Sequence, residues 1–464
     1  MRRVPSFVAR LPHLAAFAGV VTFTGLAALA ACDDSSVPAA RTDAGIAAEA
    51  GDATDERAPA IDNGAPSTTY PAPHPPLPDL VNAAKGPVLT TPKVALVFYP
   101  GDARASDLEG FARKVAGSTY WSATTAEYGV GALSYTTMFE LTGETAPATI
   151  SQAQIQTKMA GDLASGKLGV PDPQTIYTLV FPAGTTVTQD NPFTTLLGPL
   201  MSCQAFSGYH DNVAVALSDA GAKTDFAYAV IPTCKPADVA SLTSVMSHEW
   251  VEAATDPLVT SNGFFSVTGG PNSAFFGPDT DHAVWSLLGG GEAGDLCEPS
   301  GPSIDFAPPE IGYPVQRTWS NVAARASHDP CVPHIAGPAY FAAAPVLTQT
   351  VTFSTSFTGS VTTKGTVIAV GASGTVEVDL FSDGDVNGPI TVKAEDLLST
   401  LYGSYGLAKT LDFEWDRTEG VNGEKLHLTV SVTASSFLGG AHGFMITASN
   451  GNRKQVWPGL VVEQ

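Results

Sequence analysis

Strand-like and helix-like segments alternate between about residues 90 and 336, and this alternation constrains the fold more than any other feature. Short apolar runs typical of buried strands occur at residues 93–99, 175–181, 213–217 and 226–231. Between them, apolar residues recur at helical spacing at residues 107–115 and 150–163, the second opened by Thr149. The pattern predicts a mixed α/β domain over residues 90–336.

From about Gly337 the helical spacing fades and every second residue is apolar instead. The alternating runs lie at residues 350–357, 375–381, 425–432 and 443–448. Asn-Gly pairs, which favour tight turns, separate several of them: Asn387-Gly388, Asn422-Gly423 and Asn450-Gly451. These alternating runs and turns predict a C-terminal all-β, immunoglobulin-like sandwich over residues 337–464.

The N-terminus has the order of a bacterial export signal. Three arginines within the first ten residues precede an almost uncharged run at residues 14–31, which ends in Leu29-Ala30-Ala31-Cys32. This ending resembles the lipobox of lipoproteins, in which the cysteine thiol takes a diacylglycerol. An uncleaved anchor helix is the alternative, but the run is slightly short for a span and acidic residues follow it directly. We expect residues 1–31 to be removed and Cys32 to anchor the chain to a membrane of the cell envelope, at the outer membrane or cell surface.

Residues 32–89 are rich in Ala, Asp, Pro, Ser and Thr and show no apolar period, so they are predicted to form a disordered tether. The chain carries 23 basic and 45 acidic side chains, a net charge of -22. Such a charge repels phosphate backbones, which argues against a nucleic-acid partner. The predicted partners are a membrane, through Cys32, and an extracellular peptide or glycan.

Four further cysteines occur in the predicted α/β domain: Cys203, Cys234, Cys297 and Cys331. An even number of cysteines in an exported chain predicts two disulfides, with three possible connectivities. Pairing Cys203 with Cys234 and Cys297 with Cys331 closes the two shortest separate loops, and we expect that arrangement.

Residues 236–254 are predicted to form a helix that begins at Pro236 and carries the chemistry of the chain. His248 and Glu252 are four residues apart, so both project from one face and can hold one ion. Glu249 lies beside them. The arrangement is that of the HExxH helix of metallohydrolases with a carboxylate in place of the second imidazole, and zinc accepts that replacement. The alternative is that these are ordinary polar residues near a helix end.

Several motifs around this helix resemble the extracellular phosphate-induced, or Exordium-like, proteins of plants and their bacterial relatives. The resemblance covers roughly residues 90–335. Its motifs are Tyr128-Gly129-Val130-Gly131, Cys203 followed by Gly208-Tyr209-His210, Ile231-Pro232-Thr233-Cys234, the HExxE helix with Thr255-Asp256-Pro257, Trp285, residues 292–297, and Trp319-Ser320-Asn321 ahead of Cys331. The resemblance implies an exported mixed-fold, metallopeptidase-like domain whose site includes His248, Glu249, Glu252 and the pair Glu292 and Asp295.

The sequence leaves the third metal ligand open. Asp295 is favoured slightly over Glu292, because a disulfide at Cys297 would fix its backbone. Asp256 stands where the plant pattern usually has Asn, so it is expected to cap or brace a turn. Three histidines in loop-like sequence are alternatives, of which the first is the best because it belongs to the resemblance: His210, His282 and His328. One imidazole and two carboxylates would neutralise zinc and weaken its Lewis acidity, so slow hydrolysis is expected.

Two further features are weaker. The long segment 257–291 is typical of a lid, and its four phenylalanines could bind an apolar substrate side chain or simply pack the loop down: Phe264, Phe265, Phe275 and Phe276. Asp383, Asp385 and Asn387 match the opening of a calcium loop, but position twelve is Ala394, so a plain acidic turn is the stronger interpretation.

Two functions follow from these features. In the first, the chain is a surface-tethered zinc hydrolase, a peptidase in which His248, Glu252 and Asp295 hold the metal and Glu249 is the general base. In the second, it is a noncatalytic binding or adhesion lipoprotein with a structural metal site, whose sandwich grips glycan or protein. The sequence contains no Gly-x-Ser-x-Gly elbow and no phosphate-binding glycine loop, and no free cysteine is expected for thiol chemistry, which argues against serine and cysteine hydrolases.

Overall fold

The computed structural model describes residues 62–82, 85–190, 198–217, 221–235, 237–259, 276–300, 304–335, 337, 339–355, 359–403 and 406–464. The predicted signal peptide, Cys32 and the first part of the tether lie outside these residues. So do Phe264, Phe265 and Phe275 and the side chain of Phe276, and with them the lid interpretation.

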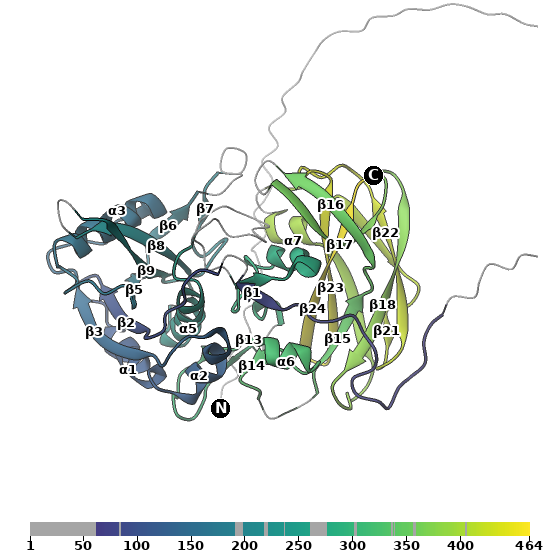
Figure 1. The fold of residues 1–464 in the computed structure, drawn as a ribbon, viewed down its shortest axis with the longest axis horizontal. Coiled ribbons are helices and arrows are strands. Elements are labelled where there is room, and N and C mark those ends of the chain that lie inside the picture. The colour runs from purple at the N-terminus through teal and green to yellow at the C-terminus, as the bar shows by residue number, and fades with distance from the viewer. Residues whose placement is uncertain are drawn as a thin grey trace, which may run out of the picture. The chain divides into compact units, whose positions relative to one another are not determined.

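A five-stranded sheet organises the α/β region (Figure 1). Its strand order is β3-β2-β5-β9-β8, with β3, β2, β5 and β9 parallel and β8 antiparallel at one edge. The strands are β2 (Lys93–Phe98), β3 (Ser134–Glu140), β5 (Thr175–Phe181), β8 (Tyr209–Ala216) and β9 (Lys223–Pro232). The four predicted strands are confirmed, although β8 begins four residues earlier than the predicted run at 213–217.

Helices cover both faces of this sheet. The helices are α1 (Ala105–Val115), α2 (Thr119–Thr125), α3 (Gln152–Ala164) and α5 (Val239–Thr255). Buried residues of α1 and α5 share one core cluster with Leu96 and Ile176, whereas α3 packs against the alternate strand residues, such as Val97 and Leu179. Because neighbouring strand residues point to opposite faces, the all-apolar strands supply both cores.

The helix predicted at 150–163 begins two residues later than expected. Ser151, not Thr149, is its N-cap: the Ser151 side chain accepts a hydrogen bond from the Gln154 N–H, and the Gln154 side chain accepts one from the Ser151 N–H. Thr149 belongs instead to β4 (Thr149–Ser151) in a small sheet with β6 (Thr186–Gln189) and β7 (Leu200–Met201).

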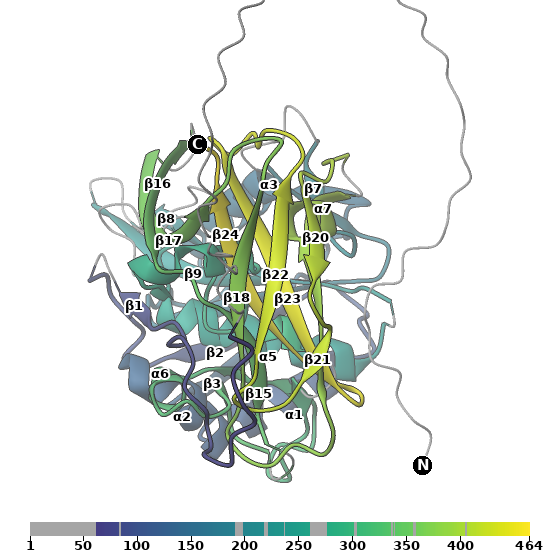
Figure 2. The ribbon, with the colours of Figure 1, turned by 90° about the vertical axis from the view of Figure 1, so that its right-hand side faces the viewer.

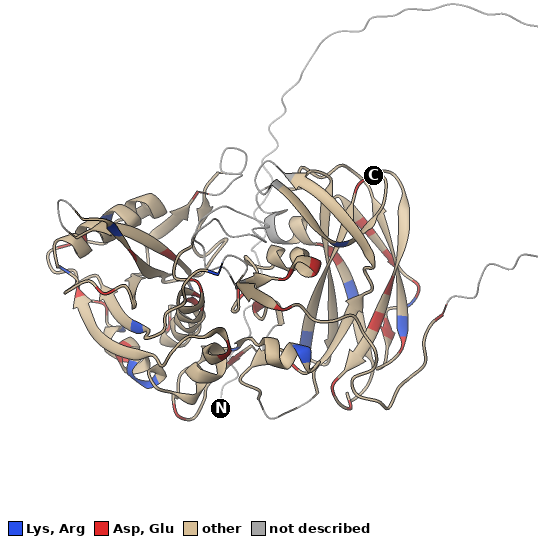
Figure 3. Cartoon of the chain, viewed as in Figure 1, with Lys and Arg blue, Asp and Glu red and all other residues tan. Residues whose placement is uncertain are grey.

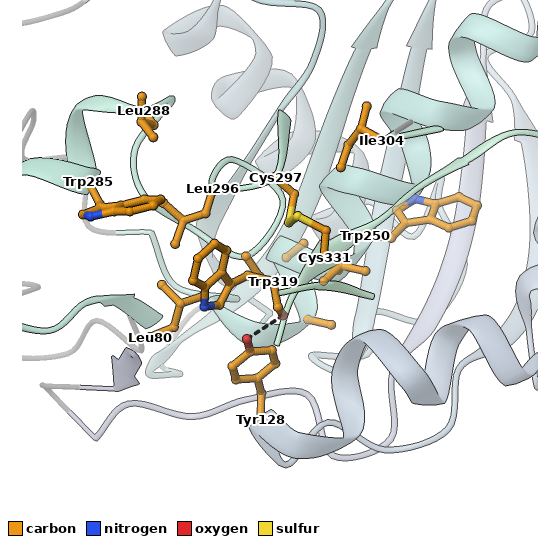
Figure 4. Close-up of a cluster of buried hydrophobic side chains, with 14 of the residues drawn as sticks. Leu80, Tyr128, Trp250, Trp285, Leu288, Leu296, Cys297, Ile304, Trp319 and Cys331 are labelled. Atoms are coloured by element: carbon orange, nitrogen blue, oxygen red, sulfur yellow. Dashed lines mark hydrogen bonds between the residues drawn. A yellow bond between two sulfur atoms is a disulfide. The ribbon is translucent and has the colours of Figure 1, made fainter. Parts of the chain in front are cut away.

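Short elements fill the stretch between α5 and the C-terminal strands. They are β10 (Phe276–Pro278), η2 (Thr280–Leu287), η3 (Glu298–Ser300), β11 (Asp305–Phe306), β12 (Val315–Gln316), β13 (Thr318–Trp319), α6 (Asn321–Arg325) and β14 (Cys331–Val332). The 3-10 turn η1 (Ala126–Tyr128) lies earlier in the chain, and the Tyr128 hydroxyl donates to the Trp319 carbonyl oxygen at 2.7 Å (Figure 4). This bond joins two segments that lie 191 positions apart in the sequence.

The C-terminal region is β-rich, as predicted. A four-stranded sheet of order β15-β18-β22-β20 faces a six-stranded sheet of order β16-β17-β24-β23-β19-β21 (Figure 2). Apolar residues of both sheets, among them Leu428 and Phe444, form one core cluster. The elements are β15 (Phe341–Pro345), β16 (Gln349–Thr355), β17 (Gly359–Val367), β18 (Ser373–Ser382), β19 (Ile390–Asp396), α7 (Leu397–Tyr402), β20 (Leu411–Trp415), β21 (Glu419–Gly420), β22 (Lys425–Val432), β23 (Ala441–Asn450) and β24 (Arg453–Val462).

The hydrophobic core continues across the change of pattern near Gly337. Trp285 packs edge-on against Trp319 of the α/β region at 5.5 Å and against Trp457 of β24 at 5.4 Å, between ring centroids. Figure 4 shows Trp285 and Trp319 among the buried side chains of this junction. Residue 337 therefore marks a change of secondary structure and not a break in the core.

The second part of the predicted tether is ordered. β1 (Leu80–Asn82) pairs with β10, and Ala72 and Leu77 are buried. The Asn422 amide donates to the Ser67 and Thr69 carbonyl oxygens at 2.9 and 3.0 Å. Extending the disordered tether to residue 89 was wrong for residues 63–82, because side-chain partners far along the chain satisfy this proline-rich backbone.

Both predicted disulfides are present, Cys203–Cys234 and Cys297–Cys331. Such bonds persist in oxidising compartments, so they indicate an extracellular or secreted protein. Within the described ranges, no helix is long and apolar enough to cross a membrane. Acidic and basic residues occur in both the α/β region and the sandwich (Figure 3).

Candidate metal centre

Helix α5 positions the central residues of the site. Asp238 is its N-cap and accepts a hydrogen bond from the Ser241 N–H at 2.9 Å, so the helix begins at Val239 and not at Pro236 as predicted. Pro236 lies outside the described residues. Trp250 is fully buried and its indole N–H donates to the Thr178 hydroxyl at 2.8 Å. This anchor ties the helix to β5 and fixes the side chains beside Trp250.

His248 and Glu252 project from α5 toward one point, as the HExxE spacing predicted. The His248 Nε2 lies 3.0 Å from the Glu252 Oε2 and 3.7 Å from the Asp295 Oδ1. Ligand atoms of His248, Glu252 and Asp295 all lie within 4.8 Å of one another, and all three residues are buried. The structure thus brings the expected third ligand, Asp295, to the helix.

The loop that carries Asp295 wraps around the Glu252 carboxylate. The backbone N–H groups of Gly294 and Asp295 donate to the Glu252 Oε1 at 3.0 and 3.2 Å. The Glu292 N–H donates to the Asp295 Oδ2 at 3.3 Å. The disulfide at Cys297 ties this loop to β14, so one face of the site is fixed by covalent and backbone bonds.

Glu292 lies in a second group of potential ligands, with His210 and Glu252. The His210 Nε2 is 3.7 Å from the Glu292 Oε2, and its Nδ1 is 3.8 Å from the Glu252 Oε2. Sequence reasoning kept His210 only as an alternative ligand, on the strength of the Gly208-Tyr209-His210 motif. The structure places it at the centre, as the second residue of β8.

Glu249, the predicted base, is buried in the same cluster with 4% of its surface exposed. Its Oε2 lies 3.7 Å from the His210 Nδ1. Gly208 allows this packing, because a Cβ there would lie 2.5 Å from the Glu249 Oε1. Gly208, two residues before His210, therefore leaves the space that the Glu249 carboxylate occupies.

Burial dominates the electrostatics of the cluster. It raises the pKa of Glu249, Glu292 and Asp295 above the ordinary carboxyl value, the last two strongly. Burial also acts to raise the pKa of Glu252, but the adjacent His248 outweighs it and the net shift is downward. Among the described residues, no Lys or Arg forms an ion pair with these carboxyls. The cluster lacks a permanent positive charge of its own.

The residues present fit a divalent cation. The ligand atoms are imidazole nitrogens and carboxylate oxygens, the donor types that zinc takes in proteins. The His210 Nε2 is buried and has no hydrogen-bond partner among the described residues, although its ring is surrounded by carboxylates. A buried polar atom without a partner is costly unless something is bound to it.

The other predicted residues belong to neither ligand group, although Asp256 is buried close enough to His210 and Glu252 for their charges to act on it. Asp256 is the C-cap of α5, as expected of a turn residue, and burial raises its pKa to about 6. His282 contacts Asp279 at 2.9 Å, and neither it nor His328 belongs to the two ligand groups. The Asp383 carboxylate accepts a hydrogen bond from the Tyr340 N–H at 2.7 Å, which favours the plain turn over a calcium site there.

Comparison of the chain with protein-family models and with curated proteins found no match. The resemblance to the phosphate-induced proteins therefore rests on the sequence motifs, and the site stands on its geometry.

Proposed function

We propose that this protein is a zinc-dependent hydrolase of the peptidase class that works outside the cytoplasm. The observation that carries the proposal is the convergence of His248, Glu252 and Asp295 with Glu249 beside them in a buried cluster. His248, Glu252 and Asp295 would hold the ion. Zinc bound there supplies Lewis acidity, which polarises a carbonyl oxygen and acidifies water.

Glu249 is the general base of the proposed reaction. Its pKa is raised by burial, and a base titrates most usefully when its pKa approaches the working pH. The Glu249 carboxylate faces His210, whose pKa is itself raised to about 10: burial lowers it, but the charges of Glu292, Glu249 and Glu252 outweigh burial. The His210 imidazole, whose Nδ1 faces the Glu249 carboxylate at 3.7 Å, would hold Glu249 in place and ready to accept a proton from water.

The cellular setting is part of the proposal. The two disulfides support a location outside the cytoplasm. A lipid on Cys32 would hold the protein at the outer membrane or cell surface, with residues 33–62 as the linker. Radiolabelled fatty acid incorporated by the full chain and lost in Cys32→Ser tests the anchor.

The catalytic test is Glu249→Gln in the full chain with its disulfides intact. The amide keeps the shape of the side chain but cannot take the proton, so hydrolysis of a peptide library should fall about 10²–10⁴-fold while zinc content is retained. The matched control is Glu310→Gln, an exposed glutamate that contacts Thr119, which should leave the rate unchanged. Equal hydrolysis by wild type and Glu249→Gln would show that the proposed catalysis is wrong.

A further inference from the structure

Two groups of potential metal ligands overlap in this centre, and Glu252 belongs to both. The first contains His248 and Asp295, and the second contains His210 and Glu292. The Glu252 Oε2 lies 3.0 Å from the His248 Nε2 and 3.8 Å from the His210 Nδ1, so one carboxylate oxygen faces both groups. A single ion uses only part of this donor set.

The charge of the cluster also exceeds what one ion balances. Four carboxyls meet here, those of Glu249, Glu252, Glu292 and Asp295, and their side chains are between 4% and 12% exposed. Histidine binds a metal in its neutral form, so a single divalent ion balances only two of these four buried carboxyls when all four are ionised. Removing unbalanced charge from water is expensive, whereas two divalent ions bring the total to zero.

His210 provides evidence for a second ion that is independent of the charge of the cluster. Its side chain is 6% exposed, its Nε2 has no hydrogen-bond partner among the described residues, and that atom lies 3.7 Å from the Glu292 Oε2. Glu292 comes from the loop before Asp295, whereas His210 comes from edge strand β8. Two separate segments thus bring a histidine nitrogen without a hydrogen-bond partner and a carboxylate oxygen close together.

We propose that the centre binds two divalent cations: one held by His248, Glu252 and Asp295, and a second held by His210, Glu252 and Glu292, with Glu252 shared. The proposal rests on the first ion of the proposed function and adds the second. Paired ions in hydrolases together polarise the substrate and activate the attacking water, so a second ion would place this protein among the two-metal hydrolases.

The test is metal stoichiometry. The full chain, depleted of metal by a chelator and then dialysed, is titrated with Zn²⁺ and its zinc and sulfur contents are measured together. Wild type should bind two equivalents. His210→Ala and the isosteric Glu292→Gln should each bind one, and His328→Ala, which removes an exposed histidine outside the centre, should bind two. Circular dichroism establishes that each variant is folded.

One equivalent in wild type overturns the second site, and so does the loss of all zinc from a folded His210→Ala, since His210 would then be a ligand of the only ion. Two equivalents in both His210→Ala and Glu292→Gln also overturn it. These results leave the hydrolase proposal standing if Glu249→Gln still abolishes turnover. Absence of any bound zinc from wild type would overturn both.

Discussion

Gly294 lies so close to two of the proposed metal ligands that a single added methyl group should displace them. An alanine Cβ at this position would lie 2.5 Å from the His248 Nδ1 and 2.7 Å from the Glu252 Oε1. The backbone of Gly294 is not in the left-handed region, so alanine adds no backbone strain there. The effect of Gly294→Ala is therefore steric and is directed at two proposed ligands.

The expected magnitude follows from these contacts. Distances below 3.0 Å force a shift, and overpacking of a buried site costs about 1–3 kcal/mol. Metal ligands must lie within about 0.2 Å of their ideal distances, so displacing His248 should weaken zinc binding by about 10–100-fold. The matched control is Gly161→Ala in α3, where a Cβ meets nothing within 4 Å and should stabilise the helix by about 0.5–1 kcal/mol.

Denaturant unfolding of the metal-free proteins, with disulfides intact, measures the loss of stability. Competition with a zinc-binding dye measures the loss of zinc affinity. We expect Gly294→Ala to be less stable than wild type and Gly161→Ala to be more stable. Wild-type zinc affinity in Gly294→Ala would refute the inferred contact between the 292–297 loop and the ligands of α5.

Two further predictions concern stability. Removing the Cys297–Cys331 bond, which closes a separation of 34 residues, as a double alanine variant should cost about 4 kcal/mol in unfolding experiments; a loss below about 1 kcal/mol would contradict the loop-closure argument. Burial raises the pKa of Asp379 to about 6, so the folded state holds this proton more tightly than the unfolded chain and wild-type stability falls as pH rises from about 4 to 6. Asp379→Asn should be about 1 kcal/mol more stable than wild type at pH 8, with the difference vanishing near pH 3; an equal gain at both pH values would contradict the titration.

Much of the fold could be predicted because its local signals are strong. Strand β5 is apolar throughout and has the predicted bounds, and β22 was predicted from strict alternation with the same success. The packing of residues 63–82 could not be predicted, since it depends on partners such as Asn422, which lies 350 and 355 positions away in the two bonds to Ala72 and Ser67. The common core around Trp285 and Trp457 is equally non-local, because nothing in either segment specifies which ring the other will meet.

In the candidate site, too, local spacing could be predicted from the sequence, whereas contacts between distant segments could not. The spacing of His248 and Glu252 places them together on any helix, so the five-residue HExxE motif was enough to predict that they meet. Glu252 also receives the N–H groups of Gly294 and Asp295, and those bonds exist only once the disulfide loop has closed over α5. The sequence predicted that Asp295 belongs to the site, whereas the bonds that hold it there required the fold.

His210 was underrated because the strand that carries it was predicted to begin at Val213. Within β8, Asp211 bonds to glutamines of α3, and Val213 and Val215 belong to the same core cluster as that helix. Side chains alternate along a strand, so His210 must point to the opposite face, the one that α5 covers. A β8 that begins at Tyr209 therefore directs this histidine toward the HExxE motif, and its place in the cluster follows from the two-residue period of the strand.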